Sequence, residues 1–246
     1  MNAIHEMIHS PELGRAVHVW RYGHFGPTLV VFPSAAGFAH EWQQQGMIEV
    51  LAPLIDAGRL KVWCPESNVA EAWTRKDSTP AHRLERHAAY ERFVLETLVP
   101  RIRSDLHQPD ARLMTAGCSL GATYAANMAL KQPEIFNWAL CMSGRYDVTH
   151  FMDGHVALDL YFNCPLAYVP GLQGAALERV RRQTEITLVC GRGKWEEGCI
   201  EETIALGAVF RERQIPHPLD VWGEDVSHDW AWWRRQLAHH VAQRLG

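Results

Sequence analysis

Residues 117–121 read Gly-Cys-Ser-Leu-Gly, a spacing in which a serine can serve as a nucleophile. In a G-x-S-x-G elbow the serine occupies a strained turn between a strand and a helix, which exposes its hydroxyl at the edge of a sheet. The residues two before and two after the serine crowd each other and must be nearly free of side chain. Here the apolar run 112–117 precedes the motif and the alanine-rich run 120–133 follows it. We therefore expect Ser119 to be the nucleophile of an acyl transfer, rather than a residue of an ordinary glycine turn.

A nucleophilic serine needs a base, and His228 is the histidine found where a base is expected. In hydrolases with this elbow the chain order is serine, acid, histidine, and the histidine follows the last strand. His228 comes shortly after the apolar run 217–223 and directly before the helical run 229–245. The alternative is a histidine that stands at a helix start without a role. We interpret His228 as the general base.

The third member of such a triad is a carboxylate that orients the histidine. We expect it in the loop after the last strand but one, and that loop, GRGKWEEGC at 191–199, contains Glu196 and Glu197. Asp147 is a rival because it follows an earlier strand, where some hydrolases carry the acid. We choose Glu196 as the acid, with Glu197 as the alternative.

Two backbone amides must stabilise the oxyanion that forms during acyl transfer. One is the amide of the residue after the nucleophile, Leu120. The other is expected in the loop after an early strand, where the sequence reads VVFPSAAGF at 30–38. By position we choose the amide of Ala35, with that of Ala36 second.

The elements that would position these residues alternate between short apolar runs and helical runs, which is typical of a mostly parallel sheet covered by helices. We expect one domain over residues 1–246, with residues 153–175 as a small cap or a loop that lines the cleft. The helix expected at 41–58 should break or bend near Pro53, and the one at 79–106 should kink or end at Pro100. The expected strands are 18–23, 28–33, 60–65, 112–117, 136–144, 185–191 and 217–223, and the other expected helices are 120–133, 199–214 and 229–245.

The charge and residue composition of the chain argue against several classes of partner and cofactor. A formal net charge of −4 gives no reason to expect a nucleic acid or an anionic membrane as partner. No apolar run is long enough to span a membrane, and the N-terminus does not resemble a secretory signal. The six cysteines are scattered without a C-x-x-C pair, which favours free buried thiols in a reducing cytoplasm. No His/Asp/Glu cluster has the spacing of metal ligands, so we expect neither a metal nor a cofactor.

The chain resembles the putative-esterase family of α/β-hydrolases, which includes esterase D (S-formylglutathione hydrolase), the enterochelin and feruloyl esterases and the antigen 85 mycolyltransferases. The segments that carry the resemblance are FPSAAGFAHEW, HRLERHAAYERFVLETLVPRI, GCSLGA, CGRGKWEEGC and DVWGEDVSHDWAWWRRQL. It implies an α/β-hydrolase fold without a large lid domain, and a serine esterase without metal or cofactor. It also supports Ser119 and His228, and favours Glu196 or Glu197 over Asp147.

The expected function is therefore hydrolysis of small to medium esters or thioesters through an acyl-serine intermediate. An acyltransferase of the same fold is one alternative, since an alcohol or amine could replace water. A catalytically silent binding protein of this fold is another, although such a module needs no triad. The substrate is expected to be a small molecule, and a homo-oligomer is compatible with the sequence.

Overall fold

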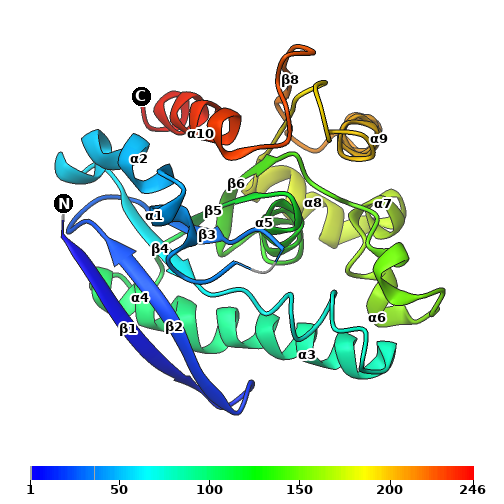
Figure 1. The fold of residues 1–246 in the computed structure, drawn as a ribbon, viewed down its shortest axis with the longest axis horizontal. Helices are drawn as coiled ribbons and strands as arrows, with labels where there is room; N and C mark the ends of the chain where they lie inside the picture. Colours follow the sequence, from blue (N-terminus) through cyan, green and yellow to red (C-terminus); the bar gives the residue numbers. More distant parts are fainter. Residues whose placement is uncertain (1, 36) are drawn as a thin grey trace.

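The computed structural model describes residues 2–35 and 37–246, and its centre is a sheet of eight strands in the order β1-β2-β4-β3-β5-β6-β7-β8 (Figure 1). β1 pairs antiparallel with β2 and β2 pairs antiparallel with β4, whereas all the later pairs are parallel. The chain therefore forms the mostly parallel sheet that the sequence predicts. The strands are β1 (Ala3–Ser10), β2 (Arg15–Tyr22), β3 (Thr28–Phe32), β4 (Lys61–Pro65), β5 (Leu113–Cys118), β6 (Phe136–Met142), β7 (Ile186–Cys190) and β8 (Leu219–Val221).

Helices cover both faces of this sheet (Figure 1). On one face lie α1 (Glu41–Gln44), α2 (Met47–Asp56) and α10 (Trp230–Leu245). The helices on the other face are α3 (Pro80–Arg92), the π-helical segment η1 (Phe93–Leu98), α4 (Val99–Leu106), α5 (Leu120–Lys131), α8 (Gly174–Gln183) and α9 (Cys199–Glu212).

The two faces have separate apolar cores, and alternate residues of each central strand belong to different cores. In β3, for example, Leu29 and Val31 pack toward α2 and α10, whereas Val30 and Phe32 pack toward α3 and α5. All four side chains are buried. A strand buried on both faces reads as a continuous apolar run, which is why the central strands could be located from the sequence.

Neither of the two prolines ends its helix. The helix expected at 41–58 is divided at Gly46, which has a positive φ of 71°, and Pro53 lies inside α2 without ending it. The long helical run continues past Pro100, which lies in the first turn of α4. The π-helical segment η1 directly before it widens the turn and accommodates a residue without an N–H.

Two elements were not expected at all. β1 has a clean alternation of exposed and more buried residues and forms a hairpin with β2 at the sheet edge. The segment after the expected cap contains the amphipathic helix α8, which buries Leu177 and Val180. Both patterns are visible in the sequence, but each is short and lies outside the run of buried strands.

Residues 149–171 form short helices and not a separate lid. They are η2 (Thr149–Met152), α6 (Leu158–Tyr161), α7 (Pro165–Tyr168) and η3 (Val169–Gly171). Arg83 of α3 is fully buried and binds this segment, donating to Phe151 O (2.9 Å) and to the Asp153 carboxylate (2.5 Å). Their role as a cap or cleft lining stays a prediction.

All six cysteines are buried free thiols, as expected. Among the described residues, no helix is both long and apolar enough to cross a membrane.

Candidate active site

Ser119 lies in the sharp turn between β5 and α5, at the carboxyl end of the central strand. Its φ of 56° and ψ of −126° place a non-glycine residue in a sparsely populated region of backbone space. Such strain costs about 1–3 kcal/mol and is maintained only by strong surroundings. Here the Ser119 amide donates to Met142 O (2.9 Å), and Ser119 O accepts from Ala122 N (3.0 Å). The side chain is partly exposed, and its hydroxyl has no hydrogen-bond partner among the described residues.

The two glycines of the motif are required by close backbone approach. A Cβ on Gly117 would overlap the carbonyl group of Gly121. A Cβ on Gly121 would lie 2.5 Å from Pro33 O and closer still to Phe32 O. The start of α5 therefore packs directly against the loop that follows β3.

We expect Gly121→Ala to lower the free energy of unfolding by about 1–3 kcal/mol and to lower kcat as well, because the added methyl displaces the loop after β3. Urea unfolding and ester turnover measure the two effects. Gly171→Ala is a matched control, since its Cβ would approach only the hydroxyl end of Tyr161, at 3.0 Å. A Gly121→Ala protein as stable and active as the wild type would contradict the packing described here.

His228 lies in the loop between β8 and α10, and backbone hydrogen bonds join this loop to the one after β7. Arg192 N donates to Gly223 O (3.1 Å), Gly193 N to Val226 O (2.9 Å) and His228 N to Lys194 O (3.0 Å). Cβ atoms on Gly191 or Gly193 would overlap Val226 or come too close to it, so the loops approach because these positions are glycine. This backbone pairing sets which residues of the two loops face each other.

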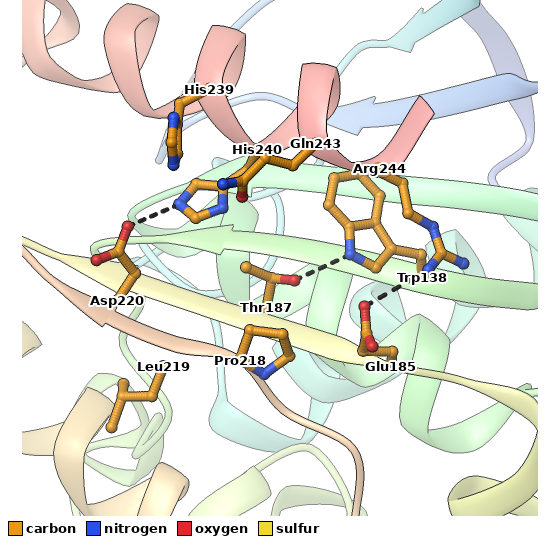
Figure 2. A pocket seen from close by; sticks show the side chains of 10 residues that line it. All are labelled: Trp138, Glu185, Thr187, Pro218, Leu219, Asp220, His239, His240, Gln243 and Arg244. Carbon is orange, nitrogen blue, oxygen red and sulfur yellow. Dashed lines mark hydrogen bonds and ion pairs between the residues drawn. The ribbon is translucent and has the colours of Figure 1, made fainter. Parts of the chain in front are cut away.

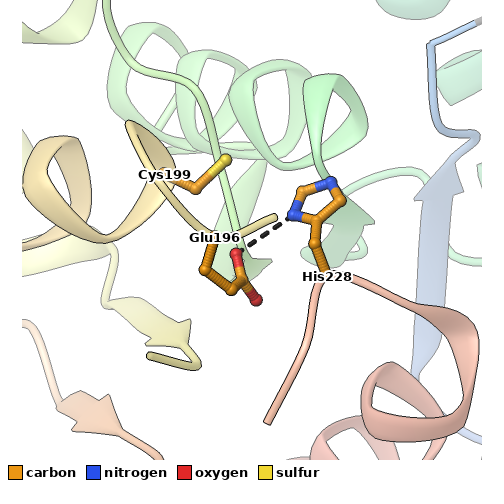
Figure 3. A group of neighbouring side chains, drawn as sticks. All are labelled: Glu196, Cys199 and His228. Atoms are coloured by element: carbon orange, nitrogen blue, oxygen red, sulfur yellow. Dashed lines mark hydrogen bonds and ion pairs between the residues drawn. The ribbon is translucent and has the colours of Figure 1, made fainter. Parts of the chain in front are cut away.

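The pairing brings His228 against Glu196, as Figure 3 shows. His228 Nδ1–H donates to Glu196 Oε2 (3.0 Å), and the second ring nitrogen points away from the carboxylate. The imidazole is 19% exposed and rests edge-on against Trp233, with ring centroids 4.8 Å apart. The ring is thereby held in one orientation with one nitrogen free to exchange a proton.

Glu196 is only 1% exposed, and its carboxylate is held from several sides. Ser143 Oγ donates to Oε1 (2.6 Å), and Trp233 Nε1 donates in turn to Ser143 Oγ (3.0 Å). Gly191 N, at 3.4 Å, also donates to Oε1. These donors compensate a buried negative charge, which would otherwise be costly.

The alternative acids lie elsewhere. Glu197 is exposed, whereas Glu196 is buried. The two side chains point in different directions in the turn that follows Trp195, which has a positive φ of 66°. Asp147 accepts from Thr149 N (3.0 Å) and Thr149 Oγ1 (2.5 Å), and no hydrogen bond joins it to His228 among the described residues.

The two expected oxyanion donors lie on neighbouring segments. Leu120 is the first residue of α5, where the amide has no partner within the helix. Ala35 lies in the loop after β3, which packs against the start of α5, and its amide makes no hydrogen bond to any described residue. Ala36, the second choice, lies outside the described residues.

Glu41, at the start of α1, is a residue of this region that the sequence analysis missed. Its carboxylate accepts from Ser34 N (2.8 Å) and Ser34 Oγ (2.6 Å). Burial raises the pKa of Glu41, and the two bonds from Ser34 oppose that rise. Ser143 and Trp233 were also missed as supports of the acid, because they become neighbours only in the folded chain.

The cysteines near the site are not alternative nucleophiles. Cys118 is fully buried, and this burial raises the pKa of its thiol well above the usual value. Cys199 has a donor atom within 4.8 Å of those of Glu196 and His228, a geometry open to a metal ion. Burial raises the pKa of the Cys199 thiol to about 12.

A separate pocket of about 540 Å³ lies between α10 and strands β6 to β8 (Figure 2). Its residues are Trp138, Glu185, Thr187, Pro218, Leu219, Asp220, His239, His240, Gln243 and Arg244.

Asp220, His239 and His240 of this pocket have donor atoms within 4.8 Å of one another, a cluster that no sequence spacing indicated because β8 and α10 meet only in the fold. His240 is buried and pairs with Asp220 (3.1 Å), while His239 is exposed. Asp220 is partly exposed, and its contact with His240 already gives the buried imidazole a partner, so we assign no metal here.

Comparisons with known proteins identify the family and the fold of the chain. A family model described as putative esterase matches residues 32–243. A ferulic acid esterase structure is similar over 100% of this chain and 98% of its own, with a TM-score of 0.78 and 16% identity.

Two further solved structures have the same architecture. S-formylglutathione hydrolase from Staphylococcus aureus is similar over 100% and 96% of the two chains (TM-score 0.70, 16% identity). MPT51 from Mycobacterium tuberculosis is similar over 100% and 98% (TM-score 0.74, 14% identity). These likenesses show the α/β-hydrolase fold. No curated protein matches the sequence.

Proposed function

The chain belongs to the putative-esterase family, and from this premise we propose that it is a serine esterase in which Ser119, His228 and Glu196 form the catalytic triad. The observation that carries the proposal is the hydrogen bond from His228 Nδ1 to the buried carboxylate of Glu196. It joins the loops after β7 and β8, which leave the sheet at the carboxyl ends of the parallel strands, as the strained serine turn after β5 does. A buried carboxylate that holds a histidine in one tautomer is the arrangement that activates a serine.

The reaction would proceed in two steps. His228 Nε2 accepts the hydroxyl proton as Ser119 Oγ attacks the ester carbonyl, and Glu196 stabilises the imidazolium that results. The amides of Leu120 and Ala35 would donate to the oxyanion. His228 then gives its proton to the departing alcohol, which leaves an acyl group on Ser119. A water molecule, deprotonated by His228, then attacks the acyl carbonyl, and His228 returns the proton to Ser119 Oγ as the bond to the acyl group breaks and the acid leaves.

Carboxylic esters and thioesters of small to medium size are the substrates that we propose. Neither step needs a metal or an organic cofactor, since the histidine moves the proton and the amides stabilise the charge. The buried free thiols support a reducing compartment, and the cytoplasm is the location we propose.

Intact-mass measurement after treatment with a fluorophosphonate tests the proposal. We expect one adduct per chain, located on Ser119 by peptide mapping, because only an activated serine reacts quickly with this probe. A folded protein that gains no adduct, and that hydrolyses no ester in a panel of p-nitrophenyl esters, would instead favour the silent binding protein.

A further inference from the structure

Glu41 binds the residue immediately before the expected oxyanion donor. Its Oε2 accepts from Ser34 N and its Oε1 from Ser34 Oγ, so both carboxylate oxygens hold one residue. Ser34 precedes Ala35 in the chain, and the two bonds hold the amide and the side chain of Ser34. The carbonyl of the next peptide, which carries the Ala35 amide, accepts from Gly37 N (3.2 Å).

The carboxylate also fills the inside of the loop. A Cβ on Gly37 would lie 2.6 Å from Glu41 Oε2 and closer still to Oε1, so residue 37 can approach the carboxylate this closely only as glycine. Within the described part of the chain, the other hydrogen bonds of this segment run from Glu41 N to Phe38 O (3.0 Å), from Gly37 N to Ser34 O (3.2 Å) and from Ser67 N to Gly37 O (3.2 Å). Glu41 therefore makes the two shortest hydrogen bonds to the loop among the described residues.

Electrostatics argues that this residue acts through position and not through charge. Burial raises the pKa of Cys118, and the negative charge of Glu41, which lies near the nucleophile turn, adds to that rise. A negative charge near a developing oxyanion opposes the reaction. The carboxylate can favour the reaction only if the position that it gives to the loop outweighs this repulsion. That both of its oxygens accept from Ser34 supports a positioning role.

We propose that Glu41 is a positioning residue that holds Ser34, and with it the neighbouring Ala35, so that the Ala35 amide points at the oxyanion. The inference rests on the proposed esterase function. It differs from the proposed chemistry because Glu41 touches neither the substrate nor the triad. The amide needs such support, since a donor misplaced by about 1 Å can lose as much as 100-fold in rate.

Kinetics with p-nitrophenyl acetate is the first test. Glu41→Ala should lower kcat by about 10- to 100-fold while KM changes less than about threefold, since an oxyanion donor acts in the transition state. Glu41→Gln should recover most of kcat, because its oxygen can still accept from Ser34 N and its amino group can donate to Ser34 Oγ. Glu49→Ala, an exposed carboxylate on α2, is the matched control and should match the wild type.

Hydrogen exchange over residues 28–45 is the second test, and it needs no activity. Glu41→Ala should speed exchange at Ser34 and its neighbours while leaving the core of α5 protected. If Glu41→Ala fails to fold, Ser34→Ala decides, because it removes only the bond to Oε1 and should lower kcat about two- to tenfold.

The outcomes separate the two proposals. A wild type that hydrolyses no ester overturns the proposed function and this inference with it, before any variant is compared. An active wild type with unchanged kcat in folded Glu41→Ala, or in folded Ser34→Ala, overturns the inference alone. Faster exchange without a loss of kcat also overturns it, because Glu41 would then hold the loop without serving the reaction.

Discussion

Ser119→Ala is expected to lower kcat for ester hydrolysis by about 10⁵- to 10⁶-fold and to abolish labelling by a fluorophosphonate. The substitution removes the only atom that could form the acyl-enzyme. It removes the hydroxyl and keeps Gly117 and Gly121, whose close contacts define the turn. The residual rate should be the small one that the oxyanion donors and binding can supply.

Thermal unfolding of Ser119→Ala should show that the protein is folded, since alanine takes the place of a partly exposed side chain. Cys118→Ala is the matched control within the motif. It should still be labelled at Ser119, because burial keeps the Cys118 thiol protonated and inert. Labelling that persists in Ser119→Ala and disappears in another serine variant would place the nucleophile elsewhere.

The sequence could predict the position of Ser119 and its neighbours because the constraint is local. Gly117 must be glycine because it contacts Gly121, four residues later, and Gly121 must be glycine because it contacts the end of β3. Both glycines therefore stand at a fixed spacing from Ser119 that can be recognised in the sequence. The parallel strands could also be predicted from the sequence, because burial on both faces of the sheet gives each strand a continuous apolar run. His228 followed from chain order once the strands were placed.

The supports of the site could not be predicted, because they depend on contacts between distant segments. Ser143 meets Glu196 across 53 residues and Trp233 across 90. Glu41 lies only seven residues from Ser34, but its bond depends on how the loop after β3 folds back onto α1. Such supports have no fixed spacing to search for.

The choice between Glu196 and Glu197 also depends on contacts that the sequence could not predict. The two carboxylates are adjacent and chemically identical in the sequence. Their different burial depends on the positive φ of Trp195 and on the pairing of the loop with the one that carries His228. We therefore regard the identity of the acid as the feature most worth testing by substitution.

Glu196→Gln is expected to lower kcat by about 10³- to 10⁴-fold, although it changes the shape of the side chain very little. Gly191 N donates toward Oε1 and cannot reverse its role, so the glutamine oxygen should face that amide. The glutamine amino group then faces His228 Nδ1 and requires that nitrogen to accept. The imidazole proton must move to Nε2, the nitrogen that has to accept the proton of Ser119.

Glu197→Gln is the matched control, because it makes the same chemical change on an exposed neighbour and should leave kcat within about twofold of the wild type. Steady-state turnover of p-nitrophenyl acetate and the rate of fluorophosphonate labelling should fall together in Glu196→Gln, since both depend on removal of the serine proton. A fall in Glu197→Gln with Glu196→Gln unaffected would assign the acid to Glu197. Equal, near-wild-type rates in both variants would mean that His228 works without a carboxylate from this loop, and the buried pair would then be a structural contact between the loops after β7 and β8.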